Sequence, residues 1–244
     1  MSPRVFHAAG GWSVGARLRL DPEESRYLLR VRRIRVGEGV EVLDGHSAAW
    51  RARLVEAEGK AAVVELDEPV PEVDAMPLEL LLLVPEPRAT LEALTLASEL
   101  GATAIHLVRG EHSPTGLPSP ERITKTLRAS QRQCGRPRPP AVHRPASLEA
   151  ALRDTEARPG FVASVALRHR ATPVAVDPAV GARLLVGPEG GLMAEEAERA
   201  EQAGLRPLAL GPWVLRTPTA VAAGLARLRG ACEGPARALD GGPG

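Results

Sequence analysis

The spacing of hydrophobic residues changes character near Leu78. Before it, short stretches alternate apolar and polar residues, which is typical of strands that bury one face. These stretches lie at 16–20, 40–43, 50–55 and 61–66. The Asp44-Gly45 pair between the second and the third predicts a hairpin. Because several short strands occur without a long helix, the pattern predicts a small β-barrel domain over residues 1–72.

From Leu78 onward, predicted strands alternate with predicted helices. The run Leu78–Val84 is almost continuously apolar, as expected for a strand that is covered on both faces. Further strands are predicted at 104–108, 161–167, 183–186 and 207–210. Helices are predicted at 90–100 and 119–132, in a Glu-rich segment that ends at Gly204, and at 218–229. This alternation predicts an α/β domain with a parallel sheet over residues 73–229.

The segments around these two domains have a different composition. Residues 68–77 are rich in proline and acids, which predicts a linker. Residues 230–244 are rich in glycine and proline, which predicts a disordered tail. With 244 residues, the chain is long enough for two modest domains.

Charge and cysteine content exclude several classes of protein. The net charge is only +1, so any surface that binds nucleic acid must be local. The two cysteines, Cys134 and Cys232, and the six histidines show no metal-ligand spacing, so we expect no metal site and no disulfide framework. We find neither a signal peptide nor an apolar run near the ~20 residues that span a bilayer. A cytoplasmic protein is therefore expected.

Two glycine turns, each after a predicted strand, are the best candidates for a binding site. Strand 184–186 leads into the turn 187–191 (Gly-Pro-Glu-Gly-Gly), and strand 207–210 leads into Gly211 and Pro212. Glycine permits positive φ and lets a ligand approach backbone N–H and C=O groups. Taken alone, each turn could be an ordinary connection between a strand and a helix. Together in one α/β domain, they predict two walls of a small-molecule pocket.

Two segments rich in basic residues are candidates for contact with RNA. Segment 26–35 contains five arginines and no acid, and segment 121–144 contains Glu121 as its only acid. Arginine suits phosphate because its planar fork binds two oxygens at once. The alternative is that each segment is an ordinary solvated face of a strand or helix.

Several motifs together carry a resemblance to a known family. "LLVGPEGGLMAEE" (184–196) and "LALGPWVLRTPTA" (208–220) resemble the C-terminal signature of the RsmE family of SPOUT-class methyltransferases. Stretches 27–45, 96–108 and 133–142 match other parts of the family in the expected order. The resemblance implies a SPOUT-type, trefoil-knotted α/β domain with a parallel sheet, preceded by a PUA-like β-barrel that binds RNA. It also implies methylation, dependent on S-adenosylmethionine, of N3 of a specific uridine in small-subunit (16S) ribosomal RNA.

The resemblance assigns roles to particular residues. It implies cofactor binding by Gly187, Glu189, Gly190, Gly191, Leu210, Gly211 and Leu215. It implies RNA binding by Arg30, Arg32, Arg33, Gln133 and Arg136. The implied partners are 16S rRNA or the assembled 30S subunit, and a second copy in a homodimer.

Two residues are candidates for the chemistry itself. Methylation at N3 requires loss of the imide proton, and the Arg216 guanidinium could stabilise the resulting anion. Arg216 could instead form an ordinary salt bridge. Glu189 could be a base, or it could tie the two loops together by hydrogen bonds.

Three positions depart from the family pattern. Pro218 stands where the family has glutamate, Leu96 where a lysine is common, and His112 where arginine is favoured. The fold should tolerate Pro218, because Thr217 can cap the last helix with proline in its first turn. An RNA-binding paralogue with weakened or lost catalysis is therefore the alternative. A Rossmann-type dinucleotide enzyme is disfavoured, because no G-x-G-x-x-G follows the first α/β strand.

Overall fold

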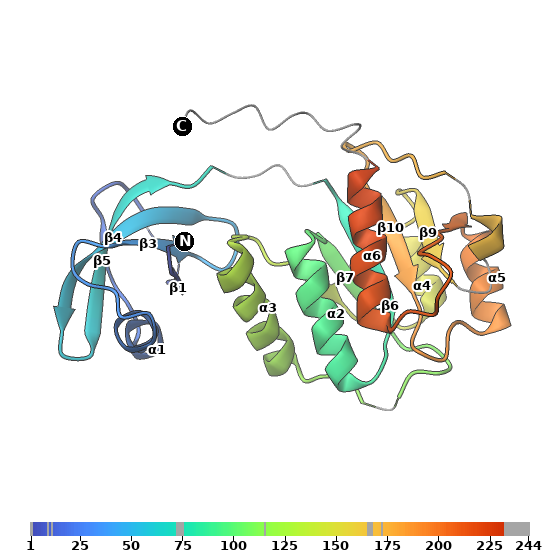
Figure 1. The fold of residues 1–244 in the computed structure, drawn as a ribbon, viewed down its shortest axis with the longest axis horizontal. Helices are drawn as coiled ribbons and strands as arrows, with labels where there is room; N and C mark the ends of the chain where they lie inside the picture. The colour runs from blue at the N-terminus through green and yellow to red at the C-terminus, as the bar shows by residue number, and fades with distance from the viewer. Residues whose placement is uncertain are drawn as a thin grey trace. The chain divides into compact units, whose positions relative to one another are not determined.

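The computed structural model describes residues 2–8, 10, 12–71, 76–114, 116–164, 168–171 and 173–231. The chain divides into two compact units. Unit 1 comprises 1–74 and 128–139, and unit 2 comprises 75–127 and 140–244 (Figure 1). Most of the predicted tail, from residue 232, lies outside the described residues, as does part of the predicted linker. Within the described ranges, no helix is both long and apolar enough to cross a membrane.

Unit 1 contains a five-stranded sheet in the order β1-β3-β4-β5-β2. The strands are β1 (Arg4–Phe6), β2 (Arg17–Arg19), β3 (Gly39–Leu43), β4 (Ala49–Glu58) and β5 (Ala61–Pro69). β1 runs parallel to β3, and the other neighbours are antiparallel. The alternating residues Val40 and Val42, Leu54, and Val64 and Leu66 form its buried core. The four strands predicted from alternation are therefore present, whereas β1, which pairs with β3, was not predicted.

The predicted hairpin at Asp44 is confirmed, and its side chain organises the turn between β3 and β4. Asp44 Oδ1 accepts hydrogen bonds from the backbone N–H groups of His46, Ser47 and Ala48 at 2.7, 2.8 and 2.9 Å. Burial would raise the pKa of this carboxyl, but the three hydrogen bonds outweigh it and hold the pKa below its ordinary value. Gly45 adopts the left-handed φ of +77° that the turn requires.

Unit 1 also contains two helical elements that the sequence pattern did not predict. Helix α1 (Pro22–Arg26) begins at Asp21, whose side chain accepts from the Glu24 backbone N–H at 2.8 Å. It continues into one π-helical turn, η1 (Tyr27–Val31). These elements are too short to display a helical hydrophobic period.

The last residues of α3 (Pro120–Cys134) belong to unit 1 and are held there by arginine contacts. The Arg132 guanidinium lies 2.5 Å from Glu24 Oε1 and 4.3 Å from the Tyr27 ring centroid. The Arg128 guanidinium lies 4.7 Å from the ring centroid of Phe6. These two arginines of the predicted basic segment therefore help to hold the unit together.

Unit 2 contains a six-stranded sheet in the order β11-β9-β10-β6-β7-β8. The strands are β6 (Leu78–Leu83), β7 (Ala104–Val108), β8 (Ala141–His143), β9 (Gly160–Ala163), β10 (Ala182–Val186) and β11 (Leu205–Pro207). Every neighbouring pair is parallel, as predicted. The strands at the centre, β10 and β6, are almost entirely buried, which explains their nearly continuous apolar sequence.

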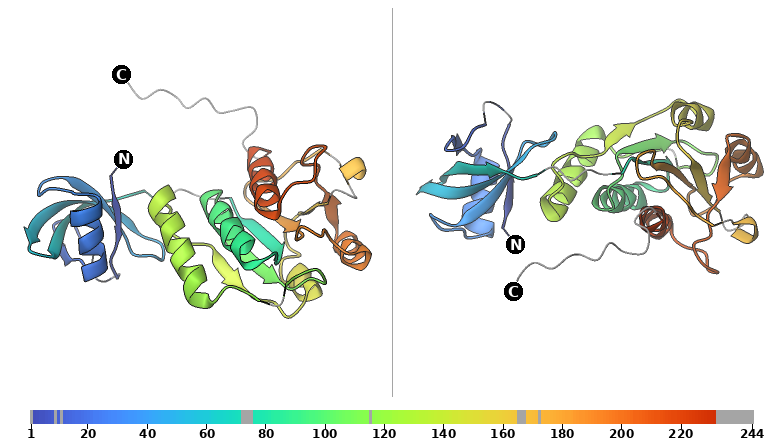
Figure 2. Two further views of the ribbon diagram at one scale, coloured as in Figure 1. Left: turned by 60° about the horizontal axis from the view of Figure 1, so that its bottom comes forward. Right: turned by 90° about the horizontal axis from the view of Figure 1, so that it is seen from above.

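Helices cover both faces of this sheet. Residues of α2 (Pro87–Glu99), α3 and α6 (Thr217–Gly230) share a core with Leu80 and Leu82, which face one side. Residues of α4 (Leu148–Asp154) and α5 (Ala194–Gln202) share a core with Leu81 and Leu83, which face the other. Helices α2 and α6 lie side by side (Figure 2). The 3₁₀ turn η2 (Arg168–Arg170) precedes β10.

The placement of β11 differs from the sequence prediction. The strand lies at 205–207, so the predicted range 207–210 is wrong except at its first residue. The Leu208 N–H donates to Val162 O at 2.9 Å, so the backbone at position 207 faces the open edge of the sheet, where proline is tolerated. The strand ends at Pro207, and residues 208–210 lie beyond it. The prediction at 161–167 is confirmed for 161–163 and wrong at Ser164, and 165–167 lie outside the described residues.

Candidate functional site

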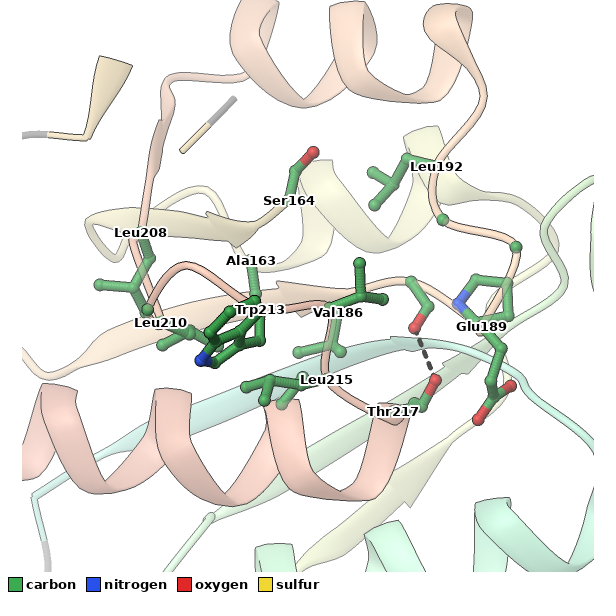
Figure 3. Close-up of a pocket in the computed structure, with 17 residues that line it drawn as sticks. Ala163, Ser164, Val186, Glu189, Leu192, Leu208, Leu210, Trp213, Leu215 and Thr217 are labelled. Atoms are coloured by element: carbon green, nitrogen blue, oxygen red, sulfur yellow. Dashed lines mark hydrogen bonds between the residues drawn. The ribbon is translucent and has the colours of Figure 1, made fainter. Parts of the chain in front are cut away.

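A cavity of about 340 Å³ lies at the edge of the unit 2 sheet where β9, β10 and β11 end (Figure 3). Two segments form most of its wall. The first glycine loop, residues 187–193, follows β10, and the second glycine loop, residues 209–216, leads into α6. Both loops follow the carboxyl ends of parallel strands, which is where open α/β sheets bind ligands.

The seven residues predicted to bind a cofactor all line this cavity. They are Gly187, Glu189, Gly190, Gly191, Leu210, Gly211 and Leu215. The structure thus brings together residues from two loops that are separated in sequence by α5 and β11. Val186, Leu208 and Ala220 extend the apolar part of the wall.

The two loops are joined by Thr217, the first residue of α6. Its side chain is 2% exposed, and Oγ1 donates to the backbone carbonyl of Gly187 at 3.0 Å (Figure 3). The prediction that Thr217 caps α6 is therefore wrong. Arg216 occupies the cap position and makes no side-chain capping bond, while Pro218 lies in the first turn as expected. The hydroxyl instead satisfies a carbonyl at the start of the first glycine loop.

The cavity fits a ligand with an adenine ring and a short polar chain. Its volume lies in the range of about 300–1,000 Å³ that is usual for small-molecule sites. Gly191 and Gly211 have φ of +76° and +108°, a conformation that a side chain would strain. At Gly187, a Cβ would lie 2.8 Å from Leu192 Cδ1, so a larger residue there would require that side chain to move. Apolar walls and accessible backbone groups together suit a flat base with a polar edge.

Of the two residues proposed for the chemistry, Glu189 lines this cavity and Arg216 does not. Glu189 is exposed and lines the cavity (Figure 3). Arg216 is exposed and follows Leu215, which is itself a wall residue.

The five residues predicted to bind RNA all belong to unit 1. Arg30, Arg32 and Arg33 are exposed at the end of η1 and directly after it. Arg33 has φ of +56°, which is uncommon for a residue with a side chain. Gln133 is exposed and Arg136 is half-buried. The Gln131 amide holds the turn beside them, because its Nε2 donates to Pro137 O at 2.7 Å.

Comparison with protein families matches both units of the chain. A model described as RNA methyltransferase domain matches residues 72–229, and one described as RNA methyltransferase PUA domain matches residues 20–67. The parallel α/β sheet, its glycine loops and the preceding PUA domain are those of the SPOUT-class RNA methyltransferases.

Individual relatives define the family more narrowly. The ribosomal RNA small subunit methyltransferase E of Synechocystis sp. is 30% identical over 240 residues, which cover 90% of this chain and 75% of that protein. The protein of the same name from Mycobacterium bovis is also 30% identical, over 86% of this chain and 85% of that one. This chain belongs to the ribosomal RNA small subunit methyltransferase E family.

A solved structure supports the same assignment. The ribosomal RNA small subunit methyltransferase E of Neisseria gonorrhoeae, bound to S-adenosyl methionine, superposes with a TM-score of 0.81 at 26% identity. The match covers 95% of this chain and 98% of that one. The predicted fold class, a SPOUT-type α/β domain preceded by a PUA domain, is confirmed.

Proposed function

We propose that this protein transfers the methyl group of S-adenosylmethionine to N3 of a specific uridine in 16S ribosomal RNA. The observation that carries the proposal is the cavity at the carboxyl edge of the parallel sheet, lined by both glycine loops. Membership of the methyltransferase E family supplies the class of substrate. The cavity supplies a place in which a methyl donor can be held.

Different residues of the two loops bind different parts of S-adenosylmethionine. Gly187, Gly190, Gly191 and Gly211 leave backbone groups open to the ligand, and Leu210 and Leu215 offer apolar surface to its adenine ring. When bound, the cofactor supplies an electrophilic methyl group on a sulfonium. Positioning provides much of the rate of such a transfer, so neither a metal nor a covalent intermediate is needed.

Two side chains act on the uridine. In the transfer, N3 forms a bond to the methyl carbon, the carbon–sulfur bond breaks with its electron pair on sulfur, and the N3 proton leaves. Arg216 stabilises the charge that develops on the uracil ring as that proton departs. Glu189 is placed on the cavity wall, where its carboxylate can accept the proton.

RNA contact is assigned to unit 1 and its PUA domain. Arg30, Arg32 and Arg33 bind phosphates, with Gln133 and Arg136 beside the end of α3. The functional division at residues 72 and 73, with the tail from residue 230 outside both domains, belongs to this proposal. So do the 16S rRNA or assembled 30S substrate, a homodimer as the active form, and a cytoplasmic location.

A transfer assay tests the proposal. The purified protein is incubated with isotopically labelled S-adenosylmethionine and small subunits from a strain that lacks the gene, and the label is mapped by nucleoside mass spectrometry. We expect 3-methyluridine at one site. Label on another nucleoside would overturn the target base and keep the class of enzyme. Donor binding and RNA binding without transfer would favour the inactive paralogue, and would show that Pro218, Leu96 or His112 is not tolerated.

A further inference from the structure

A buried carboxylate lies behind the first glycine loop, outside the cavity. Glu196 in α5 is 5% exposed. Its Oε2 accepts from the Met193 backbone N–H at 2.9 Å, and its Oε1 accepts from the Glu111 backbone N–H at 2.9 Å. The first bond is an ordinary helix-capping bond, since Met193 is the N-cap residue of α5. The second reaches a segment 85 positions away in sequence, which capping does not require.

The segment that Glu196 reaches is the turn at 109–114, directly after β7. This turn is ordered by its own bonds, because the Gly110 N–H donates to Ser113 Oγ at 3.0 Å and the Ser113 N–H donates to Gly110 O at 3.1 Å. Gly110 leaves room for the carboxylate, as a Cβ there would lie 2.8 Å from Glu196 Oε1. The small residue and the buried acid therefore fit one another.

The same turn carries His112 against the first glycine loop. A Cβ on Gly190 would lie 3.1 Å from His112 Nδ1 and 3.2 Å from Cγ. The ring nitrogen Nδ1 lies 3.4 Å from the Gly191 carbonyl. The first glycine loop is thus held at its end by the Met193–Glu196 bond and covered at its middle by His112. Glu196 links the two, because its other oxygen holds the turn that carries His112.

We propose that Glu196 is a positioning residue for the cofactor: it ties the turn at 109–114 to the end of the first glycine loop and so fixes the wall of the cavity. The inference rests on the proposed function, in that this wall is taken to bind S-adenosylmethionine. A buried carboxylate with two backbone donors is costly to disturb, because hydrogen bonds to a charged acceptor are stronger than those between neutral groups. The loop itself has glycine at three of its seven positions, so it needs such an external constraint to keep one conformation.

Two substitutions disturb the bonds of Glu196, one by changing the carboxylate itself and one by changing the glycine beside it. In Glu196→Gln, one oxygen is replaced by an amide NH₂ that faces a backbone donor, so one of the two bonds is lost. In Gly110→Ala, the new methyl group displaces Oε1 while leaving the carboxylate intact. Matched controls are Glu195→Gln, an exposed acid on the same helix, and Gly116→Ala, where a Cβ meets nothing within 4 Å.

Equilibrium dialysis of labelled S-adenosylmethionine and steady-state kinetics on rRNA form the first readout. We expect each substitution to raise the Kd for the cofactor by about tenfold or more, with KM for RNA within about twofold of wild type. The effect of the double variant should be smaller than the sum of the two single effects, because both substitutions act on the bonds of the same carboxylate. Unchanged cofactor affinity in correctly folded Glu196→Gln would overturn the proposal.

Hydrogen exchange without ligand keeps this inference separate from the proposed function. Both substitutions should speed exchange in peptides covering 109–114 and 187–193 together, while the controls should leave these peptides unchanged. Faster exchange in only one of the two peptides would contradict the tie between them. A wild-type protein that fails to bind S-adenosylmethionine would refute the proposed function, and the exchange result would still decide whether Glu196 joins the two segments.

Discussion

The two edges of the parallel sheet in unit 2 differ in the types of residue that form them. At the carboxyl edge, glycine backbone and apolar side chains surround a cavity. Near the amino edge, the register pairs Glu79 of β6 with Arg183 of β10, and both are largely buried. Glu79 lies 3.1 Å from Arg158 Nη1 and 3.4 Å from His106 Nε2. One edge leaves its polar groups available to a ligand, and the other uses them within the protein.

The buried guanidinium of Arg183 joins two helices to the sheet. Nη1 donates to the Leu152 carbonyl and to Thr155 Oγ1, and Nη2 donates to the Ala203 carbonyl. These acceptors lie at or just beyond the ends of α4 and α5, so one side chain joins both helices to β10. Burial lowers the pKa of the guanidinium and the Glu79 charge opposes that shift. Charged side chains near the amino edge thus stabilise the fold, whereas backbone groups at the carboxyl edge are available to a ligand.

The largest effect is expected at the carboxyl edge. Arg216→Ala should lower the rate of methyl transfer about 10²–10³-fold, because the developing charge on the uracil loses its cation. Affinity for S-adenosylmethionine should stay within about twofold, since the loop glycines are intact. Single-turnover kinetics and equilibrium dialysis measure the two quantities, with Arg199→Ala, an exposed arginine of α5, as the control. A rate within threefold of wild type would make Arg216 an ordinary surface residue.

Arg183→Met should affect stability and spare the chemistry. The methionine keeps an apolar stem, but the three acceptors at the ends of α4 and α5 lose a donor. We expect the free energy of unfolding to fall by about 2–4 kcal/mol. Urea denaturation followed by circular dichroism gives this number. The rate of transfer per folded molecule, measured well below the midpoint, should be unchanged; a large loss of rate would show that the two edges are coupled.

The exposed arginines of unit 1 carry charge that faces solvent, unlike the buried charges near the amino edge of the sheet. Replacing Arg30, Arg32 and Arg33 by alanine should weaken RNA binding about tenfold and reduce the salt dependence of log K by about 0.7–0.9 per lost phosphate contact. Cofactor affinity should not change. Arg51 and Arg53, which pair with Glu68 and Asp67, provide the control pair. RNA affinity is measured by fluorescence anisotropy at several salt concentrations. If the two sets of substitutions weaken RNA binding equally, the assignment of the RNA-binding surface is wrong.

The smallest effect is a pH dependence at the amino edge. Burial would raise the pKa of Glu79, but its bond to His106 and the charge of Arg158 hold that pKa below its ordinary value. An acid with a lowered pKa stabilises the folded state above its ordinary pKa, and this contribution is lost as the pH falls through the lowered value. Glu79→Gln should therefore cost about 1 kcal/mol near pH 7. Unfolding curves from pH 7 to 3 should converge for the two proteins, and a constant difference would contradict the assignment.

Much of the fold could be predicted because its signals are local. The apolar run at 78–84 and the glycines after β10 have meaning within a few neighbouring residues, and the parallel sheet and the cavity follow from them. The Glu196–Glu111 bond could not be predicted, since nothing near either residue marks a contact 85 positions away. Thr217 was given the wrong role because a hydroxyl before proline suits a cap, and only tertiary structure shows the Gly187 carbonyl as its acceptor.

The basic segments show the same limit. Arginines at 128 and 132 look identical in sequence to those at 30 and 32, but the first two lie over aromatic rings within unit 1. Composition therefore overestimates the charge that is available to RNA. The three-residue strands β1 and β8 went unpredicted for a related reason, since pairing with a neighbour, not their own sequence, makes them strands.

Hydrogen exchange with and without S-adenosylmethionine shows which edge of the sheet binds the cofactor. We expect saturating cofactor to slow exchange in peptides covering 187–193 and 209–216, which form the carboxyl-edge cavity, and to leave 141–158 near the amino edge unchanged. Protection near the amino edge without protection of the glycine loops, under conditions where binding is confirmed by dialysis, would place the cofactor elsewhere and contradict its assignment to the carboxyl-edge cavity.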